Sequence, residues 1–227
     1  SGALYYLNAG IDAQNVAVGY QAGAAMTTGQ YNILLGGECG DGLTTGTKNI
    51  AIGFRALGAE DAHGRNVAIG YYALAVQNAG ADAYNVAIGY YAGKAITTGV
   101  RNVIMGGLAG DALTTGSYNV AVGYDALSTE DGDGRNVAVG YQALLTQNAG
   151  ADAYNVAVGF YAGTAITTGN ENVLIGGLAG DALTTGSMNV AVGYSALSAE
   201  DAHGRNVAIG HQALQALNAG ADAYNIG

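Results

Sequence analysis

An acidic turn that occurs three times carries the residue types that are richest in chemistry. It reads E-D-A-H-G-R at residues 60–65 and 200–205, and E-D-G-D-G-R at 130–135. A His beside two carboxylates can hold a divalent cation, and D-G-D-G resembles the start of a calcium loop. The later ligands of an EF-hand are missing, however, and Asp133 replaces the His in the middle copy. We interpret the segment as an exposed acidic turn balanced by its own Arg, and predict no metal site and no cofactor.

The other polar residues give little support to catalysis or to nucleic-acid binding. The chain has no G-x-S-x-G elbow and no P-loop Lys, and its three His are placed by a repeat. Adjacent carboxylates such as Glu60 and Asp61 are poorly placed to flank one glycosidic bond. Seven basic residues against seventeen acidic ones give a net charge of −10, which disfavours a nucleic-acid partner. We predict that the protein is not an enzyme, and that the lone Cys39 is a small buried residue.

Candidates for surface contacts fall at two variable places. Tyr72, Tyr91 and Tyr161 share one position of the repeat, where their rings could stack on sugars or simply cover a flank. A two-residue insertion recurs in Q-N-A-G-A-D-A-Y or L-N-A-G-A-D-A-Y. Insertions in repeat proteins often map to the binding face, although a tolerated bulge is the alternative. The polar candidates in these insertions are Asn78, Asp82, Asn148, Asp152, Asn218 and Asp222.

Thr-Thr-Gly recurs six times and suggests a second class of function. A regular Thr array on a flat β-solenoid face is typical of ice-binding proteins. The Thr pairs occupy only two adjacent repeats in every four, so no long array forms. Ice binding therefore stays an alternative that a thermal-hysteresis assay would test.

An asparagine leads each of the repeats that must position these residues. The differences between the numbers of successive asparagines run 17, 17, 17, 19, and this quartet occurs three times. The chain is therefore expected to be one array over 1–227, with super-repeats at 15–84, 85–154 and 155–224. The leading residues are Asn15, Asn32, Asn49, Asn66, Asn85, Asn102, Asn119, Asn136, Asn155, Asn172, Asn189, Asn206 and Asn225.

The residues after each asparagine predict a short strand. With the asparagine counted as position 1, Val, Ile, Leu or Met stands at positions 2 and 4, usually with Ala between them, and Gly follows at position 5. This is the period of a strand that ends in a turn. The later I-T-T-G or L-T-T-G segment is expected to form a second short strand. The sequence thus predicts an all-β, parallel β-solenoid, a β-roll or β-helix of about 13 coils stacked about 4.8 Å apart.

Three columns of residues have predicted structural roles. The asparagines from Asn15 to Asn206 are expected to form a buried amide ladder. Position 6 is mostly aromatic but is Gly in the coils where position 3 is Leu34, Ile104 or Leu174, so we expect positions 3 and 6 to share packing space. Position 3 alternates away from Val and Ile, so we expect its alanines to form an exposed apolar stripe, a seam between copies of the chain. These alanines are Ala17, Ala51, Ala68, Ala87, Ala121, Ala138, Ala157, Ala191 and Ala208.

The unit N-V-A-V-G-Y-Q-A-L at residues 136–144, followed by another asparagine after a regular interval, resembles repeats of phage tail-fibre and related surface proteins. Its V-A-I-G core is also similar to the head repeats of YadA-like trimeric autotransporter adhesins. The resemblance implies a homotrimeric fibre on a virion or bacterial cell surface, hence an extracellular location. It also implies attachment to a host glycan or protein receptor, with an adhesin head as the alternative to a tail fibre. The 17- and 19-residue coils are longer than the typical adhesin repeat, and no apolar run is long enough to predict membrane insertion.

Overall fold

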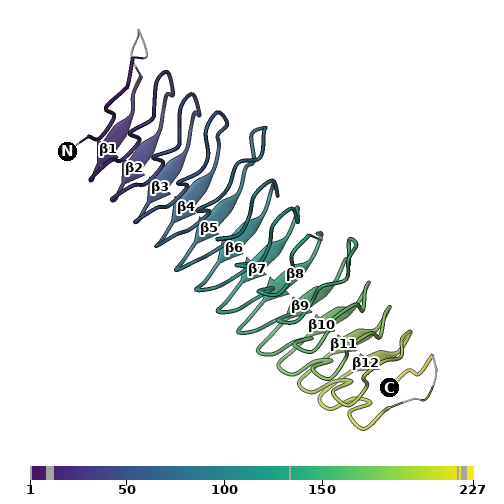
Figure 1. The fold of residues 1–227 in the computed structure, drawn as a ribbon. Coiled ribbons are helices and arrows are strands. Elements are labelled where there is room, and N and C mark those ends of the chain that lie inside the picture. Colours follow the sequence, from purple (N-terminus) through teal and green to yellow (C-terminus); the bar gives the residue numbers. More distant parts are fainter. Residues whose placement is uncertain (1, 9–12, 133, 219, 221–223) are drawn as a thin grey trace. The chain divides into compact units, whose positions relative to one another are not determined.

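The structure, a computed structural model, describes residues 2–8, 13–132, 134–218, 220 and 224–227. The chain divides into two compact units, Ser1–Gly116 and Ser117–Gly227. The strands follow one another coil by coil in each unit, as Figure 1 shows. The strands of the first unit are β1 (Val16–Val18), β2 (Ile33–Leu35), β3 (Ile50–Ile52), β4 (Val67–Ile69), β5 (Val86–Ile88) and β6 (Val103–Met105). Those of the second are β7 (Val120–Val122), β8 (Val137–Val139), β9 (Val156–Val158), β10 (Val173–Ile175), β11 (Val190–Val192) and β12 (Val207–Ile209).

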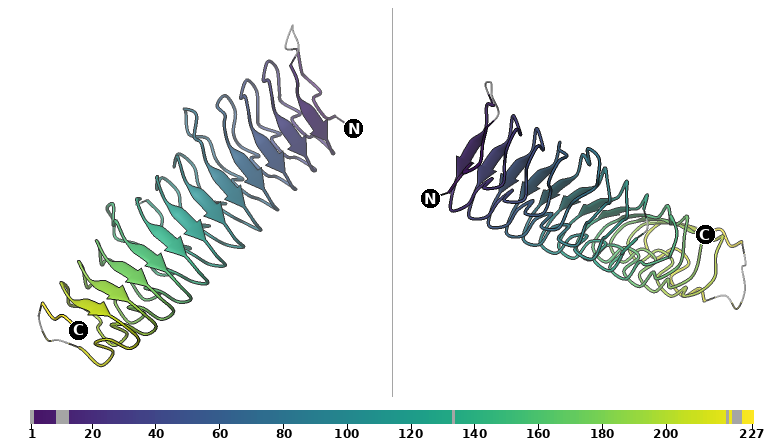
Figure 2. Two further views of the ribbon diagram at one scale, coloured as in Figure 1. Left: turned by 180° about the vertical axis from the view of Figure 1, so that it is seen from behind. Right: turned by 45° about the horizontal axis from the view of Figure 1, so that its top comes forward.

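Each strand pairs in parallel with the next strand of its unit, and residues at the same position of the repeat face each other. Val16 is opposite Ile33 in the first unit, and Val137 is opposite Val156 across a 19-residue coil in the second. The backbone leaves each strand, passes round the far side and returns to begin the next one, as the views in Figure 2 show within each unit. The fold is therefore a parallel β-solenoid, as expected, with about 11 turns. The last asparagine-led unit adds one isolated bridge, between Ile226 and Val207.

The two faces of the strands are the reverse of the prediction. The alanines at position 3 of β3, β4, β5, β7, β8, β9, β11 and β12 have 0% of their surface exposed, and Ala17 is half-buried. Positions 2 and 4 face outward instead: Val18 is 62% exposed and Met105 is 40% exposed. The predicted seam of Ala17, Ala51, Ala68, Ala87, Ala121, Ala138, Ala157, Ala191 and Ala208 was therefore wrong, because these side chains point into the coil.

A narrow interior explains this reversal. In the coils of β3 and β4, the opposite wall supplies Leu57 and Leu74, which are fully buried, so only Ala fits at position 3. Leu34 fits at that position because Gly replaces Leu on the opposite wall. A methyl group added to Gly23 or Gly40 would lie 2.6 or 2.9 Å from the Leu34 side chain. Position 3 therefore shares its space with position 9, and not with the exposed aromatic position 6 as we had expected.

The corners of the coil require backbone in the left-handed region at residues other than Gly. Position 7 and the residue before each asparagine have positive φ, for example 54° at Arg55 and 60° at Lys48. Position 9 has positive φ whether it is Leu, as at Leu57, or Gly, as at Gly40. This conformation costs an L-residue roughly 1–2 kcal/mol. The stacked coils must supply that energy, since the sequence itself does not favour these corners.

The Thr-Thr-Gly segment does not form the expected second strand in the described residues. The amides of Thr27 and Thr28 both donate to the carbonyl oxygen of Thr44, at 2.8 and 3.3 Å. In a parallel ladder the bonds are evenly spaced along the strand. Two donors that converge on one acceptor instead make a bend, so each coil contains a single strand. No helix in the described part of the chain is long and apolar enough to cross a membrane.

Candidate functional site

Two rows of aromatic side chains follow one margin of the first unit. In the row at position 6, the rings of Phe54 and Tyr71 stack with centroids 5.7 Å apart, and those of Tyr71 and Tyr90 stack at 5.5 Å. The next residue, at position 7, supplies Tyr72 and Tyr91, whose centroids are 5.7 Å apart and whose planes are tilted by 59°. Phe54, Tyr71 and Tyr90 are exposed, whereas Tyr72 and Tyr91 are half-buried. The structure thus brings together the two tyrosines that the sequence singled out.

These two tyrosines line an open groove, which we call the tyrosine groove. It has a volume of about 700 Å³ and lies wholly within the first unit. Small residues such as Gly58 and Ala95 form part of its lining. Its larger lining side chains are Asp41, Arg55, Tyr72, Val76, Tyr91 and Lys94.

Two cations lie against the aromatic rings of this groove. The Arg55 guanidinium is 5.9 Å from the ring centroid of Tyr72, and its Nε donates to Glu38 at 2.6 Å. This hydrogen bond to Glu38 is the main reason why the pKa of Arg55 is raised. Lys94 Nζ lies 4.6 Å from the ring centroid of Tyr91, within the range of a cation–π contact. Partial burial raises the pKa of the Asp41 carboxyl, which also lines the groove. The groove therefore combines aromatic faces with both signs of charge.

One super-repeat further along the chain, most of the corresponding positions carry different side chains. Asp125 stands one super-repeat after Arg55, Gln142 after Tyr72, and Thr164 after Lys94, while Tyr161 repeats Tyr91. Gln142 Nε2 donates to Asp125 at 3.0 Å, so an amide and a carboxylate pair where Arg55 and Tyr72 meet in the first copy. The combination of two cations and two neighbouring position-7 tyrosines thus occurs once in the sequence, where the first super-repeat meets the second.

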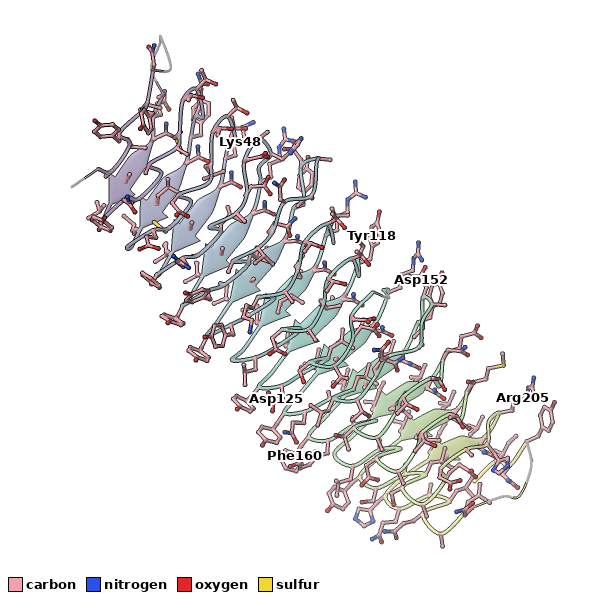
Figure 3. All side chains as sticks on the ribbon, viewed as in Figure 1. Lys48, Tyr118, Asp125, Asp152, Phe160 and Arg205 are labelled. Atoms are coloured by element: carbon pink, nitrogen blue, oxygen red, sulfur yellow. The ribbon has the colours of Figure 1, made fainter. Side chains whose placement is uncertain are left out.

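The insertion loops lie on another margin of the coil. Figure 3 shows, in the second unit, Asp125 and Phe160 along one margin, and Tyr118, Asp152 and Arg205 along the other. The tyrosines and the insertion residues, which we had grouped as candidate receptor contacts, therefore do not form one surface there. Tyr161 belongs to the first margin, since its ring packs against that of Phe160 at 4.3 Å.

Most of the insertion residues bind within their own chain. Asp82 pairs with Arg65 and also accepts a hydrogen bond from the Gly64 amide, at 3.1 Å. Asp152 pairs with Arg135. The backbone amides of Asn78 and Asn148 donate to the backbone carbonyls of Thr97 and Thr167, both at 2.8 Å. Asn218 is exposed, and Asp222 lies outside the described residues. These contacts give the loops a structural role, and their role in binding stays a prediction.

The asparagine column is a buried ladder, as predicted, but its bonds run mainly to the backbone. Oδ1 of Asn32 accepts from the amide of Asn49 in the next coil, at 2.9 Å. Nδ2 of Asn32 donates to the carbonyl of Gly46, at 2.9 Å. Bonds of the same two kinds recur at Asn85 and Asn155. Each asparagine therefore fastens two coils and satisfies buried polar groups that would otherwise be costly.

The 19-residue coils interrupt this pattern in a regular way. Nδ2 of Asn66, Asn136 and Asn206 has no hydrogen-bond partner among the described residues. The acceptor used elsewhere is the carbonyl 14 residues further on, and in these coils that position falls within the insertion loop. The two-residue insertion therefore interrupts one rung of the ladder in each quartet: the Nδ2 bond is missing, whereas Oδ1 still accepts from the amide of the next asparagine.

A buried glutamate precedes each interrupted rung. Glu60, Glu130 and Glu200 are fully buried, in the column that holds Met26 and Leu43 in the preceding coils. Burial raises the pKa of the Glu60 carboxyl. The Glu60 carboxylate accepts from the His63 amide at 3.3 Å, and Asp61 and His63 each have a ligand-type atom within 4.8 Å of it. The turn is therefore not simply an exposed acidic loop, since its first residue belongs to the core.

Alignment of the coils column by column could have revealed these buried glutamates. Position 12 reads Met26, Leu43, Glu60 and Gln77 in the first quartet, so the acids stand in register with apolar core residues. Cys39 is fully buried, as predicted, and its burial raises the thiol pKa to about 11. The hydroxyls of Thr27 and Thr44 donate to carbonyls of the next coil, at 3.2 and 2.9 Å, and are therefore partly engaged within the chain.

Comparisons with known proteins add no family to this geometry. No family model, no curated protein and no solved structure matches the chain.

Proposed function

We propose that the protein is a structural segment of a surface fibre, such as a phage tail fibre or a similar virion appendage, in which it forms a homotrimer. One observation carries this proposal: the outward face of the strands is apolar. Val, Ile, Leu or Met occupies positions 2 and 4 of every strand, and eight of these side chains are more than a third exposed. They are Val16, Val18, Ile33, Val103, Met105, Val158, Ile175 and Ile209. We call this surface the strand face.

A parallel sheet with an open apolar face is unusual in a protein that acts alone. Parallel sheets occur almost entirely with both faces covered, and large exposed apolar patches mark interaction surfaces. The strand face recurs at the same position in each coil, so a partner with the same spacing could cover it along its length. Another copy of this chain has that spacing. The homotrimer that we proposed at the buried alanines is therefore better supported at the strand face.

The interior suits a spacer in such a fibre. Each coil is fastened to the next by backbone hydrogen bonds, such as Val16 to Asn32 at 2.8 Å, and by the asparagine ladder. This arrangement repeats through both units without depending on any one site. The margin that carries the aromatic rows of positions 6 and 7 then supplies exposed side chains for attachment to a host surface. The bacterial adhesin head remains the alternative, which the genomic neighbourhood of the coding sequence would separate from a tail fibre.

Light scattering coupled to size-exclusion chromatography tests the proposal. We expect the purified chain to elute with the mass of three copies at micromolar concentration. Val103→Lys combined with Met105→Lys places charges on the strand face and should release folded monomers, with folding checked by circular dichroism. Met188→Lys is the matched control, since Met188 is 45% exposed but lies outside the strands. A wild-type chain that stays a folded monomer would overturn the proposal.

A further inference from the structure

The tyrosine groove has the size and composition of a ligand site. Its volume of about 700 Å³ is within the range of roughly 300–1,000 Å³ that is typical of small-molecule sites. Apolar side chains form much of its surface, and a few charged groups stand around them. Tyr72 and Tyr91 come from adjacent coils, so their rings offer two neighbouring platforms separated by 5.7 Å.

We propose that the tyrosine groove binds an acidic saccharide, a short chain of pyranose units carrying carboxylate groups. This inference deepens the proposed function, since it names the class of ligand for a chain that attaches to a surface. The tyrosines would stack on the apolar faces of the sugar rings, as amphipathic aromatic residues do at interfaces. Arg55 and Lys94 would then lie close to the carboxylates of the bound chain.

The distribution of charge favours an acidic ligand over a neutral one. The whole chain has only seven basic residues against seventeen acidic ones, yet two of the seven line this groove and only one of the seventeen, Asp41, does so. Both are held against aromatic rings: Arg55 is 5.7 Å from the centroid of Phe54 and Lys94 is 4.6 Å from that of Tyr91. A guanidinium retains further N–H donors after its Nε has bound Glu38, so Arg55 can also donate to a second carboxylate.

The chain itself supplies substitutions that the fold accepts. One super-repeat further along the chain, Asp, Gln and Thr stand where the groove has Arg55, Tyr72 and Lys94. The backbone is equivalent, because φ is 54° at Arg55 and 52° at Asp125, and 57° at Tyr72 and 52° at Gln142. Tyr72→Gln and Lys94→Thr therefore remove the proposed contacts without introducing a residue foreign to this position of the coil.

Titration calorimetry of the full chain with hyaluronan hexasaccharide tests the inference, since that probe carries carboxylates and no sulfate. We expect one site per chain, affinity at least tenfold lower in the Tyr72→Gln and Lys94→Thr variants, and weaker binding at high salt. Chitohexaose, a neutral chain of similar sugars, should bind at least tenfold more weakly than hyaluronan. Equal binding of both probes, or unchanged affinity in the Tyr72→Gln variant, would overturn the inference.

A gain of binding gives a second readout that misfolding cannot imitate. The combination Asp125→Arg, Ser128→Gly, Gln142→Tyr, Leu145→Ala and Thr164→Lys restores the charged, aromatic and small lining residues around Tyr161 and should raise the number of sites from one to two per chain. A stoichiometry that stays at one would count against the proposed residues. Self-association is measured separately by light scattering, so a chain that forms trimers but binds no acidic sugar would refute this inference and leave the proposed fibre intact.

Discussion

At the scale of single residues, the main cost of this fold is its left-handed corners. Lys48 adopts a φ of 60° on an exposed turn, and Arg65 adopts 63° at the same place in the next coil. Neither is a glycine, and nothing in their side chains favours this conformation. The sequence did not reveal these corners, because the residue types at these positions vary. Only the glycines found in some coils at position 9 indicate positive φ.

The change Lys48→Gly tests this cost directly. Gly adopts positive φ without strain but loses more freedom on folding, so we expect stability equal to the wild type or up to about 1 kcal/mol higher. Lys48→Val should lower stability by about 1 kcal/mol or more, since β-branched residues tolerate this region poorly. Urea denaturation measures both. Ala59→Gly is the control at a site whose φ is not positive, and it should be destabilising.

The buried Glu60 makes a prediction about pH. Its raised pKa keeps the carboxyl neutral in the fold at a pH where the unfolded chain has ionised. Its stabilising contribution is therefore complete below the ordinary pKa of Glu and is lost as pH rises through the raised value. Glu60→Gln should stabilise the protein by about 1 kcal/mol near pH 7 and by much less near pH 4.

Denaturant titrations of the wild type and the Glu60→Gln variant at the two pH values provide the test. Glu171→Gln, at an exposed glutamate, should show no such difference. The opposite result would be a Glu60→Gln variant that loses stability relative to the wild type at pH 7 but not at pH 4. That result would show that the carboxylate is needed in its charged form.

At the scale of the coil, regular spacing predicted the fold well and the orientation of the strand badly. The recurrence of asparagines at intervals of 17 or 19 residues specified parallel stacking, and the asparagine column specified a buried ladder. Alternation alone cannot say which face of a strand is inside, and Val is normally the more buried residue. The interior wall at Leu57 and Leu74 decides the matter, and its effect is visible only when the coil is closed. Similarly, the tyrosines could be singled out from the sequence, but the groove with Arg55 and Lys94 could not, since it spans several coils.

The asparagine ladder predicts a graded loss of stability. Asn172→Ala removes the acceptor for the Asn189 amide and the donor to the Gly186 carbonyl, both at 2.9 Å. We expect a cost of about 3 kcal/mol, because buried polar groups lose their partners. Asn136→Ala should cost about half as much, since Nδ2 of Asn136 has no partner among the described residues while its Oδ1 accepts from Asn155. Thermal and chemical denaturation would measure the ranking, and equal losses would contradict it.

At the scale of the whole molecule, stability and association are expected to be linked. If the strand face is covered by copies of the chain, only the folded form gains from association. The midpoint of thermal unfolding should therefore rise with protein concentration. In the Val103→Lys and Met105→Lys variant the midpoint should be lower and independent of concentration. Differential scanning calorimetry over a hundredfold range of concentration would show either result.

The order of the buried residues at position 12 has a consequence for how such a chain can change in length. In the first quartet position 12 is Met26, Leu43, Glu60 and Gln77, so each coil has its own residue there. The next quartet has the same order of two apolar residues, Ile96 and Leu113, followed by Glu and Gln. Removing one coil would put unlike residues next to each other. Without the coil of Gln77, for example, Glu60 would precede Asn85, whose Nδ2 donates to Gln77 Oε1 at 2.7 Å. Removing four restores every neighbour. The protein should therefore tolerate duplication or loss of a whole super-repeat far better than of a single coil, so that its length grows or shrinks in steps of complete quartets.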